Sequence, residues 1–188
     1  YNLVFQAKEL NRCTIEKIEF FSKNKNLVKD LKKNLVHYRG SEFQESTQQA
    51  IQQELNQYLL EQRYLSTKTT NVVKKFNKER TKVKIIFNLS DPYRYEFIFH
   101  GNQFFSHFDL IKSNKIGSQF LFVKDSALDM RETIEDLYRQ AGFPEVSIEV
   151  SQQVFKNQNK RVFVFSINEG KRVTLGKVKI NGKISRSR

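Results

Sequence analysis

The chain has 188 residues and a formal net charge of +13 at pH 7. Hydrophobic residues make up 38% of it and there are only two prolines and seven glycines, which argues against wholesale disorder and against a linker-rich chain. No apolar run approaches the roughly 20 residues of a membrane-spanning helix, and the single cysteine excludes an intrachain disulfide.

The first half of the chain predicts a strand, two helices and two further strands. Thr14–Phe20 alternates apolar and polar residues, as a strand does. Ser46 and Gln49 are spaced as a capping box for the second helix, which we expect to end near Arg63–Tyr64. The stretch "LSTKTTNVVKKF" is β-capable but polar, which is typical of an edge strand, whereas "TKVKIIFNL" predicts a central strand. Apolar residues at helical spacing predict the first helix: Leu27 or Val28, Leu31 and Leu35.

The second half repeats this order. Arg94–His100 predicts a strand, and Ser106 is placed to cap a short helix that buries Phe108 and Ile111. Gly142 stands where a helix commonly ends in a left-handed residue. The stretches "VSIEV" and "RVFVFSI" then predict two more strands. The longer helix, which begins after residue 125 or 126, is expected to bury Leu128, Ile134, Leu137 or Tyr138, and Ala141.

Five sequence matches in the same order support an internal repeat, with offsets between 77 and 81 residues. "YRGSEF" matches "KIGSQF", "KIEFFSKN" matches "EFIFHGNQ", and "YLLEQRY" matches "LYRQAGF". The sequence therefore predicts two whole units, residues 13–91 and 92–171. Residues 1–12 would be the last strand of a preceding unit and 172–188 the first strand of a following one. Each unit is expected to be an α+β fold of order β-α-α-β-β, with a three-stranded mixed sheet and two helices on one face.

With the unit defined, its pattern resembles the POTRA (polypeptide-transport-associated) domain that precedes the outer-membrane β-barrel in the BamA family. The resemblance rests on "FIFHGN" and "VKINGK", on "GSEF" and "GSQF", and on "LYRQAGFPEVSIEV" and "VFVFSINEGKRVTLGKVKINGK". The first copy departs from the pattern: "FFSKNK" lacks the glycine of the Gly-Asn turn, Arg63 replaces the helix-ending glycine, and "LSDP" replaces Glu-Gly.

This resemblance implies the periplasmic part of an outer-membrane protein that assembles or secretes other proteins. Such domains are not enzymes and need no cofactor. They bind unfolded client chains or accessory assembly subunits by β-augmentation, in which an extended partner adds a strand to a sheet edge. The family's exposed edge corresponds here to about Leu65–Val73 and Val146–Val150, although each edge could instead be only solvated or covered by a neighbouring unit. The candidate partner-binding residues are Thr67, Thr69, Asn71, Val146, Ser147, Ile148, Glu149 and Val150.

The positive charge of the chain and the diversity of the family leave alternative functions open. The basic run "KNKNLVKDLKK" is either a solvated helix face or a contact for anionic lipid headgroups or acidic partners. A nucleic-acid-binding protein is the alternative from another class, but the lysines are spread over both copies and no nucleic-acid motif is present. The histidines lack metal-ligand spacing, so we expect no metal site. TamA-type proteins and two-partner secretion transporters carry similar domains and remain alternatives to an assembly factor.

Overall fold

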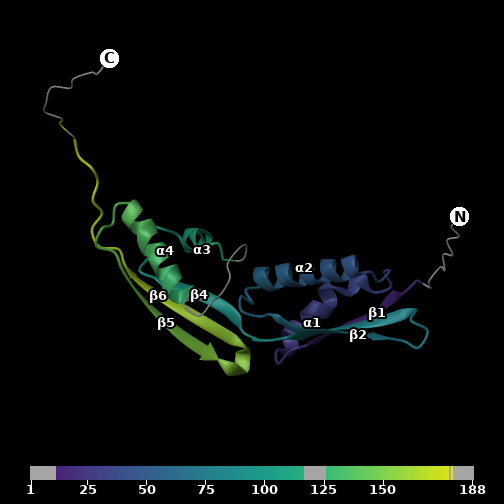
Figure 1. Ribbon diagram of the computed structural model, residues 1–188. Coiled ribbons are helices and arrows are strands. Elements are labelled where there is room, and N and C mark those ends of the chain that lie inside the picture. The colour runs from purple at the N-terminus through teal and green to yellow at the C-terminus, as the bar shows by residue number, and fades with distance from the viewer. Residues whose placement is uncertain (1–11, 117–125, 178, 180–188) are drawn as a thin grey trace, which may run out of the picture.

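A computed structural model describes residues 12–116, 126–177 and 179 of the chain (Figure 1). It contains two three-stranded sheets that follow one another along the chain. The first unit comprises β1 (Thr14–Phe21), α1 (Lys25–Asn34), α2 (Glu45–Glu61), β2 (Thr69–Phe76) and β3 (Lys82–Leu89). The second comprises β4 (Arg94–His100), α3 (His107–Ser113), α4 (Ser126–Gln140), β5 (Ser147–Phe155) and β6 (Lys160–Asn168).

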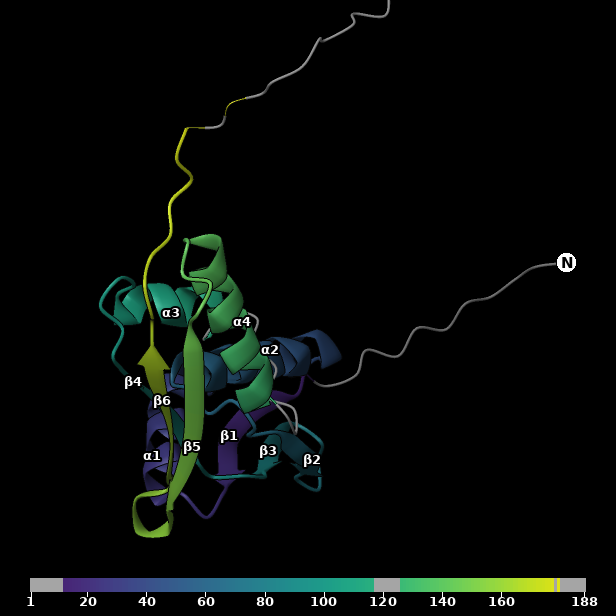
Figure 2. The same ribbon diagram turned by 90° about the vertical axis from the view of Figure 1, so that its left-hand side faces the viewer.

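Both sheets have the same mixed topology. The strand orders are β1-β3-β2 and β4-β6-β5, with the first strand of each unit parallel to the central strand and the outer strand antiparallel to it. In Figure 2, β5 is seen as the outer strand of the second sheet. The expected α+β fold of β-α-α-β-β units is confirmed in both halves.

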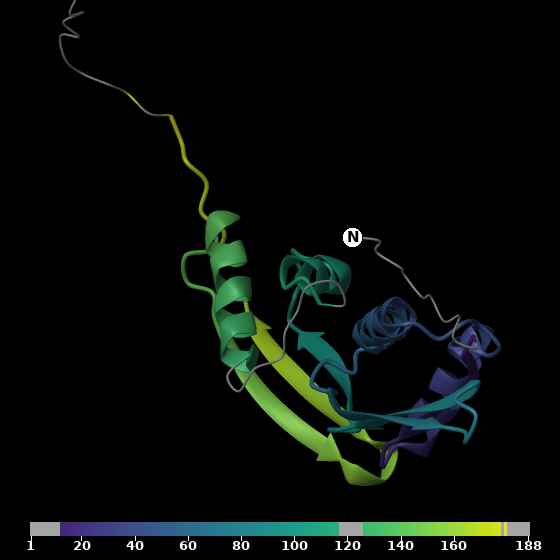
Figure 3. The ribbon, with the colours of Figure 1, turned by 45° about the vertical axis from the view of Figure 1, so that its right-hand side comes forward.

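The helices cover one face of each sheet (Figure 3), and the burial pattern of the central strands agrees. In β3, Val83, Ile85 and Phe87 are fully buried, whereas Lys82 and Lys84 alternate with them and are exposed. The apolar stripes of α1 and α2 meet this buried face, so each helix buries only the side turned toward the sheet. The core of the first unit contains Ile15, Phe20, Leu27, Leu31, Leu35, Ile51, Leu55, Leu59, Val83, Ile85 and Phe87.

The second core is richer in aromatic rings. Phe97 and Phe99 of β4 and Phe163 and Phe165 of β6 stand on the helix-covered face, with ring centres 5.2–6.0 Å apart in the pairs they form. From α4 the same core receives Met130, Ile134 and Tyr138.

Three details of the helices differ from the sequence expectation. Gln44, without a side-chain hydrogen bond, is the N-cap of α2, so the expected Ser46–Gln49 capping box is wrong. Phe108 is 70% exposed, and Leu110 takes the buried position in α3 instead. Leu128 is 49% exposed, because α4 turns the neighbouring stripe toward the sheet. The Ser106 cap is confirmed as a full capping box with Asp109.

The chain leaves the two units in the same way. The backbone N–H of Tyr95 donates to the carbonyl of Arg63 at 2.8 Å, and that of Val173 donates to the carbonyl of Gly142 at 2.7 Å. Arg63 (φ 62°) and Gly142 (φ 96°) both occupy the left-handed region at the end of their helices, so the arginine adopts the conformation for which the second copy uses glycine.

Some sequence expectations fall outside the described residues. These are the "GSQF" motif at 117–120, the preceding-unit strand over 1–12 apart from residue 12, and most of the following-unit strand over 172–188. The described residues 172–177 carry no regular secondary structure.

Candidate functional site

The outer strand β2 is an open sheet edge whose first part carries no charge. It pairs with β3 on one side only, and its register shifts between Thr69 and Asn71. The stretch "TTNVV" is followed by Lys74 and Lys75, which are the kind of residues that limit pairing along an edge. The part of this edge that can accept another strand is therefore Thr69–Val73.

The opposite edge of the same sheet is partly covered. The segment Gly40–Phe43, which contains the "GSEF" motif, lies along the outer side of β1. Ile15 N–H donates to the Ser41 carbonyl at 2.9 Å, and Gly40 N–H donates to the Ile15 carbonyl at 2.8 Å. These bonds satisfy the outward backbone groups of Ile15 that an added strand would need, so the start of β1 is covered, whereas no such segment lies along β2 in the described part of the chain.

A groove of about 770 Å³ runs beside the β2 edge. Leu59 and Leu60 line it from α2, Leu65 from the loop that follows α2, and Val72 from β2 itself. Polar side chains complete the wall, among them Gln52, which donates to the Thr69 hydroxyl at 3.1 Å. An open backbone edge next to an apolar groove can bind the main chain and alternate side chains of an extended peptide.

The predicted residues of the first edge are only partly placed as expected. Thr69 and Asn71 lie in β2 and line the groove. Thr67 comes before the strand, is 8% exposed, and donates its hydroxyl to the Asp91 carbonyl at 2.5 Å. The strand occupies Thr69–Phe76, so the predicted range Leu65–Val73 begins too early and ends too soon.

The second edge is longer than expected. Ser147 and Glu149 are exposed on β5 and Val150 is partly buried, while Val146 just before the strand and Ile148 within it are 7% and 5% exposed. The strand continues to residue 155 instead of ending at 150, and the side chains of residues 151–155 are exposed. A cavity of about 360 Å³ lies at the far end of this strand, at 154–158.

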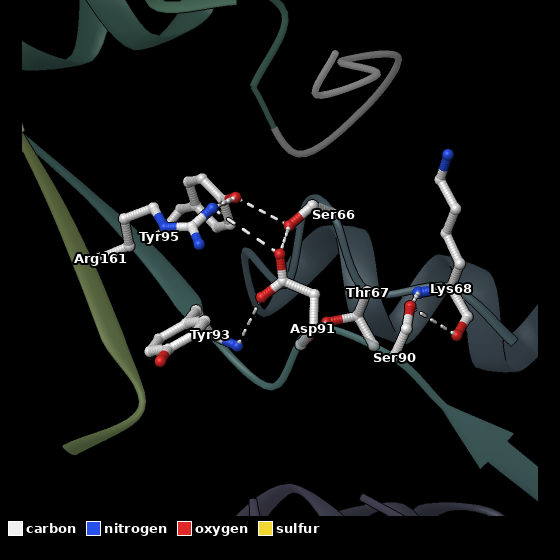
Figure 4. Close-up of polar contacts among 8 residues, drawn as sticks. All are labelled: Ser66, Thr67, Lys68, Ser90, Asp91, Tyr93, Tyr95 and Arg161. Carbon is white, nitrogen blue, oxygen red and sulfur yellow. Dashed lines mark hydrogen bonds and ion pairs between the residues drawn. The ribbon is translucent and has the colours of Figure 1, made fainter. Parts of the chain in front are cut away.

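A polar joint connects the units next to the groove (Figure 4). We define it as Ser66, Asp91, Tyr95 and Arg161, which come respectively from the loop after α2, the linker between β3 and β4 (residues 90–93), β4 and β6. Ser66 Oγ donates to the Asp91 carboxylate at 2.5 Å and lies 2.7 Å from the Tyr95 hydroxyl. Arg161 donates to the Tyr95 hydroxyl, and its Nη1 lies 3.7 Å from Asp91 Oδ2.

Aromatic rings hold the arginine of the joint. The guanidinium carbon of Arg161 lies 5.0 Å from the ring centre of Tyr93 and 5.2 Å from that of Tyr95, both within cation–π range. Burial raises the pKa of the Tyr95 phenol, although the hydrogen bond with Ser66 and the charge of Arg161 oppose the rise. The phenol is therefore protonated at neutral pH and available to these partners.

Sequence patterns did not indicate the joint. Ser66 and Arg161 are 95 positions apart and belong to different units, and each reads locally as an ordinary polar loop or strand residue. The only available signal is the cluster of Asp91, Tyr93 and Tyr95 in "SDPYRY", which leads from β3 into β4.

Within residues 12–116, 126–177 and 179, no group of three or more His, Cys, Asp or Glu residues could hold a metal ion. None of the helices in this same part of the chain is long and apolar enough to cross a membrane.

Comparisons with known proteins give structural matches only. No protein-family model matches the chain, and no curated protein matches it. The solved structures that match include POTRA3-5 of BamA from Haemophilus influenzae, with a TM-score of 0.39 and 14% identity over 99% of this chain and 77% of that one. BamA from Haemophilus ducreyi lacking POTRA domains 1-3 matches with a TM-score of 0.38 and 22% identity over 83% of this chain and 29% of that one.

The N-terminal domain of Omp85 from Thermosynechococcus elongatus also matches, with a TM-score of 0.37 and 15% identity over 86% of this chain and 65% of that one. The chain spans about three tenths (29%) of the length of the Haemophilus ducreyi BamA chain that it matches.

Proposed function

We propose that the chain is a tandem of POTRA-like units from the periplasmic part of an outer-membrane β-barrel assembly factor. In this function it binds extended segments of unfolded client chains, or of accessory subunits, by adding a strand to β2. The observation that carries the proposal is the apolar groove beside an uncharged, unpaired edge at Thr69–Val73. Gly40–Phe43 covers the start of the opposite edge, at Ile15, which favours β2 over that part of β1 for a visiting strand.

The expected affinity is low and tolerant of sequence. A peptide that pairs along five residues makes about five main-chain hydrogen bonds, each contributing about 0.5–1.5 kcal/mol net. The total is about 2.5–7.5 kcal/mol, and ordering the peptide offsets part of it, so a dissociation constant on the order of 10⁻⁴–10⁻³ M, or about 4–5.5 kcal/mol, is expected. Weak binding that depends on backbone groups suits a receptor for many different unfolded chains.

The groove adds a side-chain preference. Successive side chains of an added strand point to opposite faces, so every second residue faces the wall formed by Leu59, Leu60 and Leu65. Lys68 precedes the edge and Lys75 follows its uncharged part, whereas the Lys74 ammonium already pairs with Glu45 of α2 at 2.7 Å. We therefore propose a ligand with apolar residues at alternate positions and acidic residues at its ends.

The same chain exit at both units supports a tandem that continues. Arg94 Nε donates to the Gln62 carbonyl at 3.2 Å, and Arg172 Nε donates to the Ala141 carbonyl at 3.0 Å. In the first case the next residue is Tyr95, already in β4. We propose that Val173 likewise begins the first strand of a following unit.

An NMR titration tests the proposed binding site. The probe is the end-blocked peptide acetyl-Glu-Val-Thr-Phe-Thr-Val-Glu-amide, added to the ¹⁵N-labelled chain. We expect saturable shifts of the amide resonances of Thr69–Val73, and no comparable shifts in β5. Asn56 is exposed on α2 and lines the groove, so Asn56→Trp should weaken peptide binding. Gln53 is exposed about one turn earlier on α2 and does not line the groove, so Gln53→Trp should leave binding unchanged. Shifts confined to β5, or no shifts at millimolar peptide, would contradict the proposal.

A further inference from the structure

The loop after α2 belongs to two parts of the molecule at once. Leu65 lines the groove of the first unit, yet it is 7% exposed and packs in the core cluster of the second unit with Tyr95, Phe97 and Tyr138. Leu60, which also lines the groove, packs against the same cluster. The floor of the groove is therefore built partly on the core of the neighbouring unit.

Hydrogen bonds hold this loop to the linker between the units. Ser66 donates to the Asp91 carboxylate, and Thr67, which lines the groove, donates to the Asp91 carbonyl, each at 2.5 Å. The Lys68 N–H donates to the hydroxyl of Ser90 at 3.2 Å. Asp91 has a positive φ of 33°, a backbone conformation that persists only when its surroundings fix it.

The surroundings of Asp91 are completed from the second unit. Arg161 reaches from β6 toward the Asp91 carboxylate and donates to the Tyr95 hydroxyl, which in turn contacts Ser66 (Figure 4). The Arg161 side chain is only 22% exposed, so water screens its ion pair with Asp91 less than it would screen a pair at an open surface. Arg161 is not among the residues that line the groove.

From these contacts we propose that Arg161 is a positioning residue for the peptide groove of the first unit. Arg161 fixes the side chains of Asp91 and Tyr95. Asp91 in turn accepts the hydrogen bonds of Ser66 and Thr67. The position of this loop determines where Leu65 and Thr67 lie in the groove wall. The groove then has its binding shape only while the two units are joined, so the orientation of the units regulates peptide binding. The inference rests on the proposed function of the groove.

The test compares two arginine substitutions in the whole chain. Arg161→Met keeps the apolar stem of the side chain and removes its charge and donors. Arg139→Met is the matched control, because Arg139 also pairs with carboxylates, those of Glu135 and Asp136, but on the surface of α4. Peptide affinity is measured with the same end-blocked heptapeptide, and hydrogen exchange is followed at the amides of Thr67 and Tyr95, which bond to the carbonyls of Tyr64 and Arg63.

We expect Arg161→Met to weaken peptide binding about threefold to tenfold and to speed exchange at both amides. Arg161→Lys should restore part of the affinity, because it keeps the charge near Asp91, although it lacks the planar fork of donors. Arg139→Met should leave both readouts unchanged. Ser66→Ala provides a milder loss of the same connection, with an expected effect in the same direction, if Arg161→Met does not fold.

The possible failures are distinguishable. If the unchanged chain does not bind the peptide, the proposed function of the groove is wrong, whatever the exchange data show. If the unchanged chain binds and both Arg161→Met and Ser66→Ala bind equally well while exchange at Tyr95 accelerates, the joint has loosened without affecting the groove. That result would overturn the inference and leave the proposed function intact.

Discussion

The glycine of the "FIFHGN" turn provides a quantitative test of the fold. Gly101 follows β4 with a φ of +80°, and a Cβ there would lie 2.1 Å from the carbonyl oxygen of Ile167, whereas ordinary contact begins near 3.4 Å. Gly40 has nearly the same conformation, with a φ of +86°, but a Cβ there would meet no atom within 4 Å. Changing each to alanine therefore separates backbone strain from close approach.

The two substitutions should differ severalfold in cost. Placing alanine in the left-handed region costs about 1–2 kcal/mol, and restricting the unfolded chain returns about 0.4–1 kcal/mol. Gly40→Ala should therefore lower the free energy of unfolding by about 1 kcal/mol. Gly101→Ala must in addition displace the backbone at Ile167, which pairs with Ile148 and is buried in the second core. Overpacking of this kind adds about 1–3 kcal/mol, for a total of about 2–4 kcal/mol.

Urea denaturation followed by far-UV circular dichroism gives the two free energies of unfolding, and hydrogen exchange assigns each loss to a unit. We expect Gly101→Ala to accelerate exchange in β4, β5 and β6, and Gly40→Ala to affect only the first sheet. Equal losses for the two variants, or no loss for Gly101→Ala, would refute the close approach between the turn and β6.

Three further substitutions test packing, capping and titration. Leu65→Ala should cost about 2–4 kcal/mol, seen as faster amide exchange in the second sheet although the residue lies in the first unit's loop; a loss restricted to the first sheet would contradict its place in the second core. Ser106→Ala should lower stability by about 1 kcal/mol in the same urea assay, and an unchanged midpoint would argue against the capping box. Burial and the hydrogen bond to Glu169 raise the pKa of Tyr138, so the folded state favours the neutral phenol. The stability that Tyr138 contributes is complete below the pKa of about 10 that the phenol has in the unfolded chain, and it is lost as the pH rises above that value. The urea midpoint of Tyr138→Phe should therefore fall less steeply between about pH 9 and 11 than that of the unchanged chain. Equal slopes would contradict the raised pKa of Tyr138.

Local sequence patterns predicted the order of elements because each pattern reflects which side of an element is buried. Leu27, Leu31 and Leu35 recur at helical spacing, and all three are in the first core. The alternation of "TKVKIIFNL" likewise separates the buried Val83 and Ile85 from exposed lysines. These features depend on neighbours a few residues apart, so the sequence is sufficient to reveal them.

Where two local solutions were similar, packing decided between them. Helix α4 has two apolar stripes, and the fold buries the one through Met130, Ile134 and Tyr138 and exposes Leu128. Helix α2 begins at Glu45, directly after a segment that bonds to β1 through Ser41 and to Cys13, just before β1, through Phe43. The polar residues that follow Glu45 therefore lie inside the helix and do not cap it. Helix-capping propensity is a local property, so it cannot predict a helix start that is set by hydrogen bonds to a strand distant in the sequence.

The sequence by itself determined the repeated unit, its strand and helix order, and the edge strand at Thr69 and Asn71. Only the tertiary structure decided that this edge has an apolar groove beside it and that Leu65 is shared with the second core. It also decided that Arg161 is joined to Ser66 through Asp91 and Tyr95. The physical reason is distance along the chain. Periodicity shows which side of one helix or strand is buried against the rest of its unit. A joint between units depends instead on side chains up to 95 residues apart, and these share no sequence pattern.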